Sequence, residues 1–235
     1  FRPENQEIVS IMFSKDRAMQ LDGFLASYFE NVANYSPVKV LYHTSSQEHE
    51  QSYRDLRELY KDKPVEFIKE NSFRKQLIET LENSSAGRVF FYVDDMLVTQ
   101  KIDYNWFKEV DPLTDIVSLT RGKDLVYSTV LAKPLQVPQI NHFRGSLHRF
   151  MWNEIKEFSD WSYPLGVSGY MFSRKEMLQM FKVLNFKAPN SLESSMQAFI
   201  SYFINRGGIC LDGVATPCVH TNLTQTEGYN NVLGH

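Results

Sequence analysis

The sequence predicts an α/β fold in which helices flank a mostly parallel central sheet. Along the first hundred residues, short apolar runs rich in β-branched residues alternate with segments of helical periodicity, an order typical of parallel sheets covered by helices. The 235 residues are 43% hydrophobic and 14% aromatic, which is enough apolar material for a substantial core. Neither a repeat nor a low-complexity linker interrupts the chain, so we expect a single domain over residues 1–235.

The first half justifies this fold element by element. Ile8 to Phe13 is apolar except for Ser10, as expected of a buried strand, and the next helix follows from about Ala18. A later, polar helix places Tyr53 and Leu56 on one face. The expected strands span residues 8–13, 38–42, 65–68 and 88–92, and the expected helices span residues 18–32, 48–60 and 73–81.

The second half is less regular. We expect one or two strands within residues 115–130, interrupted by a turn at 121–124, and a loop over residues 133–146, which contain two prolines. Apolar spacing predicts helices at residues 149–158, 174–184 and 190–206, followed by short strand and coil from Cys210.

Charge and cysteine content exclude several classes of protein. With 25 Lys and Arg against 28 Asp and Glu, the net charge of −3 argues against a nucleic-acid partner. Apolar runs all fall short of the roughly 18–20 residues that a membrane span needs. Cys210 and Cys218 are too few for a disulfide framework or a zinc ribbon, so we expect a reducing, cytoplasmic setting.

Two adjacent carboxylates, Asp94 and Asp95, close a strongly apolar predicted strand. Parallel sheets bind ligands at the carboxyl ends of their strands. Hard divalent cations prefer carboxylate oxygens, and such a cation neutralises a diphosphate as it leaves. The pair therefore indicates a metal–diphosphate site, with a solvated turn as the alternative.

The end of the first strand has a second polar group, in Ser14, Lys15, Asp16 and Arg17, directly after Phe13. A helix that begins beside a strand end favours anions, and the lysine and arginine add positive charge. Asp16 can accept a hydrogen bond from a ribose hydroxyl or a base, or it can cap the helix.

These two segments, about eighty residues apart, resemble the nucleotide-sugar glycosyltransferases of the GT-A fold, in particular the family-2-like enzymes of bacterial polysaccharide synthesis. The segment at residues 93–95 is similar to their DxD motif, although Val93 departs from it. The resemblance covers residues 8–98 and implies that Asp95 binds Mn²⁺ or Mg²⁺. It also implies that Asp94 lies near the ribose or the metal, and that residues 13–17 contact the donor.

Three further positions fit the resemblance. His220 matches the carboxy-terminal histidine that completes the metal site in many such enzymes, or it is an exposed tail residue. Lys75 or Arg74 would reach the diphosphate, or both lie on a solvated helix face. Glu193 matches the base that takes a proton from the acceptor, or it forms a capping box with Asn190.

The resemblance thus implies a metal-dependent hexosyltransferase that moves a sugar from a nucleotide-sugar donor, UDP favoured, to a glycan or lipid-linked acceptor. Residues 1–98 would bind the nucleotide and residues 99–235 the acceptor, in the cytoplasm or at the inner face of the membrane, in polysaccharide or capsule synthesis. Non-catalytic binding of a sugar nucleotide or glycan is the alternative from another class. A nucleotidyltransferase fits less well because residues 14–21 lack glycine, and the Tyr-x-Asp-Asp box at residues 92–95 suits a polymerase poorly because strands and helices alternate.

Overall fold

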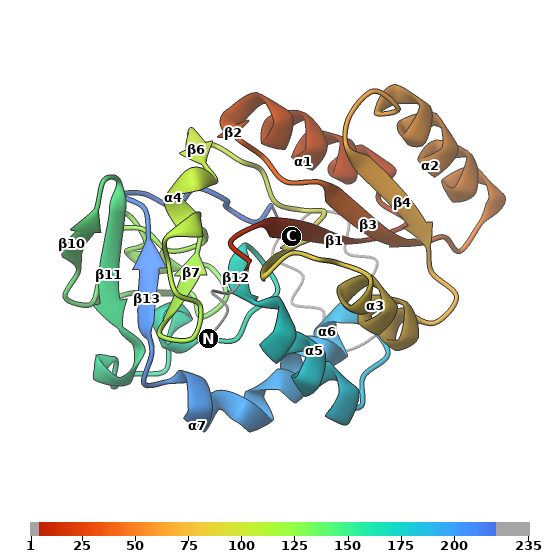
Figure 1. The fold of residues 1–235 in the computed structure, drawn as a ribbon. Coiled ribbons are helices and arrows are strands. Elements are labelled where there is room, and N and C mark those ends of the chain that lie inside the picture. Colours follow the sequence, from red (N-terminus) through yellow and green to blue (C-terminus); the bar gives the residue numbers. More distant parts are fainter. Residues whose placement is uncertain (1–4, 220–235) are drawn as a thin grey trace.

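The computed structural model describes residues 5–219, which form three layers, a central sheet with helices on both faces (Figure 1). Helices α1 (Ala18–Asn31) and α2 (Gln47–Leu59) cover one face of the sheet. Helices α3 (Phe73–Glu82), α5 (Arg174–Val183) and α6 (Pro189–Met196) cover the other. The helices of the first half are those that the sequence predicts.

Strands and helices alternate through the first half, as predicted. The strands here are β1 (Ile8–Lys15), β2 (Val32–Ala33), β3 (Val38–His43), β4 (Val65–Lys69) and β5 (Arg88–Val93). All but β2 join the central sheet, whereas β2 pairs with β6 (Ile102–Asp103) in a small separate ribbon.

The second half is built from short elements. Its strands are β7 (Asp115–Ser118), β8 (Tyr127–Ser128), β9 (Lys133–Pro134), β10 (Asn141–Arg144), β11 (Leu147–Met151), β12 (Tyr170–Ser173) and β13 (Gly207–Cys210). Besides α5 and α6 it contains helices α4 (Asn105–Lys108) and α7 (Ile200–Phe203) and the 3₁₀ turns η1 (Trp152–Glu154), η2 (Asp160–Ser162) and η3 (Gln197–Phe199).

Three sequence predictions for this half are wrong. Residues 149–158 do not form a helix, because Arg149 to Met151 belong to strand β11, which pairs with β13 and β10. The predicted loop at 133–146 contains β9 and β10. The predicted helix at 190–206 is divided into α6, η3 and α7. A short apolar segment fits the periodicity of a helix and that of a strand equally well, and pairing with neighbouring strands decides which of the two forms.

The central sheet has nine strands in the order β10-β11-β13-β7-β12-β5-β1-β3-β4. Strand β1 pairs in parallel with β3 and β5, and β7 pairs in parallel with β13. Within this sheet β11 and β12 run opposite to the other seven strands, so the sheet is mostly parallel in direction. The carboxyl ends of β1, β5, β7 and β13 consequently meet at one edge.

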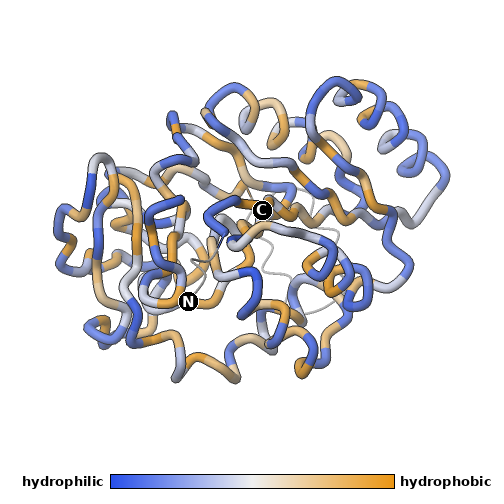
Figure 2. The backbone as a smooth tube through the Cα atoms, viewed as in Figure 1, coloured by the Kyte–Doolittle hydropathy of each residue, from blue (hydrophilic) through white to orange (hydrophobic). Residues whose placement is uncertain are grey.

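Alternation along the strands divides the core into two. Met12 of β1 and Phe90 and Tyr92 of β5 face α1 and α2, while Ile11 and Phe91 face α3 and α5. Figure 2 shows hydrophobic colouring concentrated on the central strands and hydrophilic colouring on the outer turns of the helices. Both faces of β1 and β5 are buried, which explains why both strands are mostly apolar.

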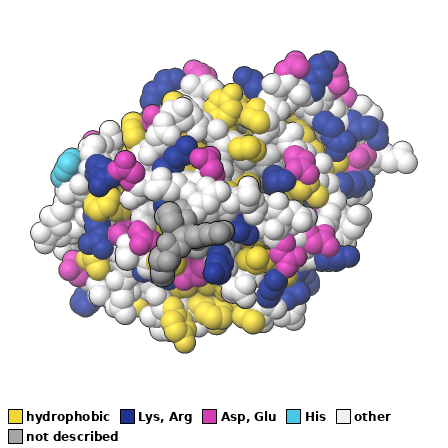
Figure 3. All heavy atoms as spheres, viewed as in Figure 1, with side chains coloured by type: hydrophobic (Ala, Val, Ile, Leu, Met, Phe, Trp, Pro, Cys, Tyr) yellow, Lys and Arg dark blue, Asp and Glu magenta, His cyan; other side chains and the backbone are white. Residues whose placement is uncertain are grey.

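The surface carries mixed charge. Figure 3 shows Lys and Arg side chains interspersed with Asp and Glu over the visible face, and apolar side chains at its lower edge, where Figure 1 places α7. Tyr202 of α7 is 72% exposed. Among residues 5–219, no helix is long and apolar enough to span a bilayer.

Candidate functional site

The ends of β1 and β5 bring the two sequence-predicted polar segments together. In the parallel register Phe13 lies opposite Val93, so the residues that follow are neighbours. Asp94 Oδ2 accepts a hydrogen bond from Ser14 Oγ at 2.7 Å, and the backbone N–H of Lys15 lies 3.4 Å from the same oxygen. Phe13 itself packs in the core, stacked against Phe91.

Arg17 links the two carboxylates. Its Nη1 lies 3.1 Å from Asp94 Oδ1 and 3.4 Å from Asp95 Oδ2, and all three side chains are buried. Two carboxylates that converge on one positive nitrogen form a place that a compact cation also suits. Burial raises the pKa of Asp94 to about 6, although Arg17 and Ser14 act in the opposite direction.

Asp16 has a strained backbone at the junction of β1 and α1. Its φ of 56° lies in the left-handed region, which non-glycine residues seldom occupy. Asp16 Oδ1 accepts a hydrogen bond from the backbone N–H of Ser45, at 2.7 Å, and this bond ties the end of β1 to the segment after β3. The residue at the helix cap is Arg17, so capping by Asp16 is not what the structure shows.

A carboxy-terminal segment runs along the residues that follow β5. The backbone N–H of Leu97 donates to the Pro217 carbonyl at 3.2 Å, and that of Val219 donates to the backbone carbonyl of Asp95 at 2.5 Å. Cys218 forms an antiparallel bridge with Met96 and is partly buried there. The proposed metal ligand His220 lies outside the described residues.

Glu193 lies on α6 and contacts the segment that precedes β12. Its Oε2 accepts a hydrogen bond from the backbone N–H of Val167, at 2.8 Å, and the Tyr163 side chain also hydrogen-bonds to it. Burial raises the pKa of this partly buried carboxyl group. Ser191 Oγ, rather than Glu193, accepts from the backbone N–H at the start of the helix, so the capping alternative does not apply.

Cys218 lies where the groups of the site meet. Burial raises the pKa of its thiol to about 12, and the negative charges of Asp95 and Glu193 act in the same direction. The positive charges of Arg121 and Arg17 oppose them. The thiol of Cys218 is thus subject to the charges of two carboxylates and two arginines, from both halves of the chain.

Arg121 is the residue of this group that the sequence analysis missed, because it was assigned to a turn. It follows β7 and is 7% exposed, with its guanidinium carbon 5.7 Å from the centre of the Tyr170 ring. A basic residue just after a buried strand, where parallel sheets bind ligands, was the signal that could have found it.

Lys75 and Arg74 are not brought to this group of residues. The Lys75 side chain is 74% exposed and pairs with Glu79 one turn further along α3, at 3.8 Å. Arg74 donates hydrogen bonds to the carbonyls of Leu184, at 2.8 Å, and Lys182, at 2.7 Å, and so ties α3 to the end of α5.

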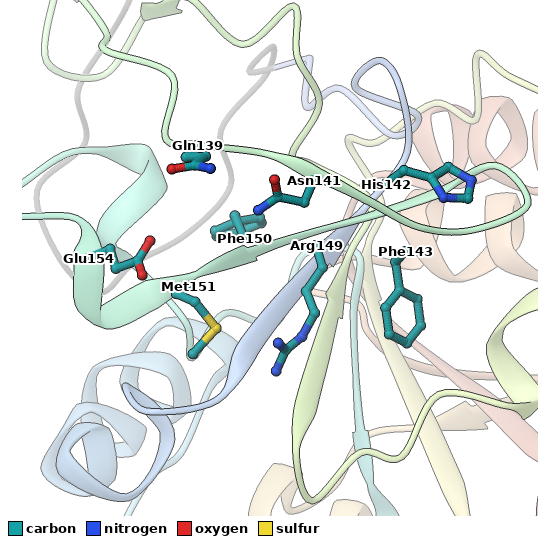
Figure 4. Close-up of a pocket in the computed structure, with 8 residues that line it drawn as sticks. All are labelled: Gln139, Asn141, His142, Phe143, Arg149, Phe150, Met151 and Glu154. Carbon is teal, nitrogen blue, oxygen red and sulfur yellow. The ribbon is translucent and has the colours of Figure 1, made fainter.

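A cavity of about 340 Å³ lies elsewhere, between β10, β11 and the residues beside them (Figure 4). Arg149 lines it and pairs with Asp115, at 2.5 Å, at the start of β7. The cavity therefore lies near the amino-terminal end of β7, whereas Asp94 and Asp95 lie at the carboxyl ends of the parallel strands. The lining contains none of the side chains that the sequence analysis assigns to the donor, the metal or the base.

Comparison with known proteins relates the chain to glycosyltransferases. No protein-family model matches it. It is 24% identical over 217 residues to the bifunctional glycosyltransferase pgtA of Dictyostelium discoideum, covering 85% of this chain and 26% of that protein. The chain thus spans about a quarter of the length of the curated relative it matches.

Solved structures share the fold. S. aureus TarS 1–349 superposes with a TM-score of 0.50 at 12% identity, covering 88% of this chain and 58% of that one. The same protein in complex with UDP-GlcNAc gives a TM-score of 0.51 at 13% identity, with coverage of 88% and 56%. These likenesses confirm the predicted fold class, a GT-A-like α/β fold with a mostly parallel central sheet flanked by helices.

Proposed function

We propose that this chain is a glycosyltransferase that uses a nucleotide-sugar donor, with UDP favoured, and a divalent cation. The observation that carries the proposal is the convergence of Asp94 and Asp95 beside the polar end of β1. The curated relative bears the name of a glycosyltransferase, and a structural neighbour was solved with UDP-GlcNAc, which supports the same activity.

The donor would bind at the joined ends of β1 and β5. Asp95 and Asp94 would hold Mn²⁺ or Mg²⁺, because their oxygens already converge on a single cationic nitrogen of Arg17. Such an ion supplies positive charge that stabilises a departing diphosphate. Lys15 and Arg17 would add to that charge, while Asp16 would contact the nucleoside. His220 remains our proposed third ligand.

Lys75 also remains proposed as a diphosphate contact, although its described position on α3 is exposed. An extended side chain on an exposed helix can change rotamer at low cost, so its ion pair with Glu79 is no obstacle.

Glu193 would act as the general base of an inverting transfer. Its carboxylate would take the proton of the acceptor hydroxyl as that oxygen bonds to the anomeric carbon. The bond from that carbon to the diphosphate breaks at the same time, and its electron pair leaves with the diphosphate. A pKa raised by burial suits this role, because a general base works best when its pKa approaches the working pH.

The finer assignments are proposals of the same kind. We take the transferred group to be a hexose and the acceptor to be a glycan or lipid-linked glycan, in polysaccharide or capsule synthesis by a family-2-like enzyme. Residues 1–98 would serve the nucleotide and residues 99–235 the acceptor. Action in the cytoplasm or at the inner face of the membrane suits such substrates.

Calorimetric titration with UDP and GDP, with and without Mn²⁺, tests the proposal. We expect one nucleotide to bind in a Mn²⁺-dependent manner and D95N to remove that dependence. D55N is the matched control, because Asp55 lies on the exposed face of α2 and accepts a hydrogen bond from Gln51. Binding without hydrolysis of any sugar nucleotide would identify a non-catalytic module instead. Absence of nucleotide binding by the unaltered chain would contradict the proposed function.

A further inference from the structure

Arg121 is a buried cation that forms no ion pair with a carboxylate of residues 5–219. Its Nη1 donates to the Thr120 hydroxyl at 2.9 Å and lies 3.3 Å from the Thr120 carbonyl, and its guanidinium faces the Tyr170 ring. Its Nε is buried and lacks a hydrogen-bond partner within the described part of the chain. The guanidinium therefore retains donor capacity inside the protein.

Burying an arginine without an opposite charge lowers the stability of the folded chain. A buried charge is normally paired, because its lost hydration is only recovered by an opposite charge or by several hydrogen bonds. Two other arginines have opposite charges as partners: Arg17 pairs with two aspartates, and Arg206 pairs with Glu176 at 2.5 Å. The buried Arg88 instead donates several hydrogen bonds, to the carbonyls of Val110 and Asn5. Within the described part of the chain, the hydrogen bonds of Arg121 go to Thr120 alone and its Nε has no partner, which points to an anion that is supplied by a ligand.

Neighbouring groups suit an oxygen-rich anion. The Ser118 and Thr120 hydroxyls lie 3.1 Å apart just before Arg121. Thr216, which hydrogen-bonds through its backbone to Leu119 at 3.0 Å, has a buried hydroxyl without a partner in residues 5–219. A guanidinium combined with hydroxyl groups is typical of phosphate and carboxylate recognition.

The position of Arg121 assigns this anion to one substrate. Arg121 follows β7, which is separated from the donor strands β5 and β1 by β12. Its guanidinium lies over the ring of Tyr170, whose hydroxyl donates to the carbonyl of Tyr163, and the Tyr163 side chain hydrogen-bonds to Glu193. The diphosphate side already has Arg17 beside Asp94 and Asp95. Because Glu193 must contact the acceptor hydroxyl, an anion bound at Arg121 lies on the acceptor side.

We propose that Arg121 binds a phosphate or carboxylate group of the acceptor, so that the acceptor of this transferase is an acidic glycan or a phosphorylated one. The inference rests on the proposed function. It deepens that function by naming the chemical class of the second substrate.

The test observes Arg121 directly. The intact chain, labelled with ¹⁵N-arginine and saturated with Mg²⁺ and the nucleotide that binds, is titrated with inorganic phosphate and, separately, with acetate. R121K assigns the Arg121 Nε–H signal, and the exposed Arg54, bonded to Gln51 at 2.7 Å, provides the reference for non-specific association. We expect the Arg121 signal to shift well before the Arg54 signal. A response to phosphate alone indicates a phosphorylated acceptor, and a response to acetate alone indicates a carboxylate.

A variant of Arg121 distinguishes anion binding from nucleotide binding. R121Q should weaken the binding of the active anion about tenfold or more, as expected for the loss of a charged hydrogen bond, and change nucleotide affinity less than about twofold. If R121Q does not fold, the titration of the unaltered chain still decides. Equal responses of Arg121 and Arg54 would overturn the inference, as would an equal loss of nucleotide affinity in R121Q. If the unaltered chain binds no nucleotide, it is the proposed function that fails.

Discussion

Replacing Arg17 with methionine would test whether the two aspartates form a cation site, without any measurement of activity. Met keeps much of the aliphatic volume of Arg but removes the charge that lies 3.1 Å from Asp94 and 3.4 Å from Asp95. Both carboxylates are buried, at 4% and 9% exposure, so water cannot replace the lost partner fully.

The structure sets the size of the effect. Removing one partner of a buried ion pair costs about 3–5 kcal/mol. For a chain of this size each kcal/mol lowers the melting temperature by about 2–4 °C. We therefore expect R17M to melt about 6–20 °C below the unaltered protein in EDTA. Mn²⁺ should restore much of this loss, because a ligand at about 100 times its Kd stabilises the folded state by about 2.7 kcal/mol.

Differential scanning calorimetry of both proteins, in EDTA and in Mn²⁺, provides the measurement. The control is R206M, which breaks a comparable pair with Glu176 of α5 and should be destabilised equally in both conditions. Mn²⁺ should stabilise R17M more than the unaltered protein, where the ion competes with the guanidinium. Equal Mn²⁺ shifts in R17M and R206M would refute the reasoning that Asp94 and Asp95 form a cation site.

Two further predictions concern Gly169 and Glu193. At Gly169, φ is +74° and an added Cβ would lie 2.7 Å from Thr216 Oγ1, whereas at Gly145, φ is +54° with open space around it. Both Ala variants carry the backbone strain of a positive φ, so the difference between them reports the packing alone. In urea unfolding, G169A should be less stable than G145A by about 1–3 kcal/mol, the cost of overpacking, and equal stabilities would contradict the packing argument. Burial raises the pKa of Glu193, so the folded state holds its proton more tightly than the unfolded chain, and stability is lost as pH rises through the folded pKa. The melting temperature of E193Q should therefore equal or exceed that of the unaltered protein at pH 8, and the two melting temperatures should converge at acid pH. The transfer rate of E193Q should fall about 10²–10⁴-fold, and full activity would exclude Glu193 as the base.

The first half of the fold could be predicted from sequence because its signals are local and strong. Strands β1 and β5 are apolar on both faces, and the helices between them have one apolar face, so pattern and burial agree. In the second half, Leu147–Met151 contains too few residues to distinguish the periodicity of a helix from that of a strand. Its pairing with β13, more than fifty residues later, decides that it is a strand.

The candidate site was predictable to the same extent. Ser14, Arg17, Asp94 and Asp95 follow strands that the sequence identifies, and parallel pairing brings strand ends together. Phe13, Lys75 and Arg74 could not be placed, because sequence does not show which face of a strand end or helix is turned toward a ligand.

The sequence by itself determined the α/β class, the order of the first four sheet strands along the chain and the carboxylate pair at the end of β5. Tertiary structure alone decided that Arg17 bridges those carboxylates, that Glu193 contacts Val167 instead of capping its helix, and that Arg121 is buried against the Tyr170 ring. The physical reason is range: periodicity and turn chemistry act over a few residues, whereas these contacts join segments more than twenty-five residues apart, through a sheet whose strand order no local pattern encodes.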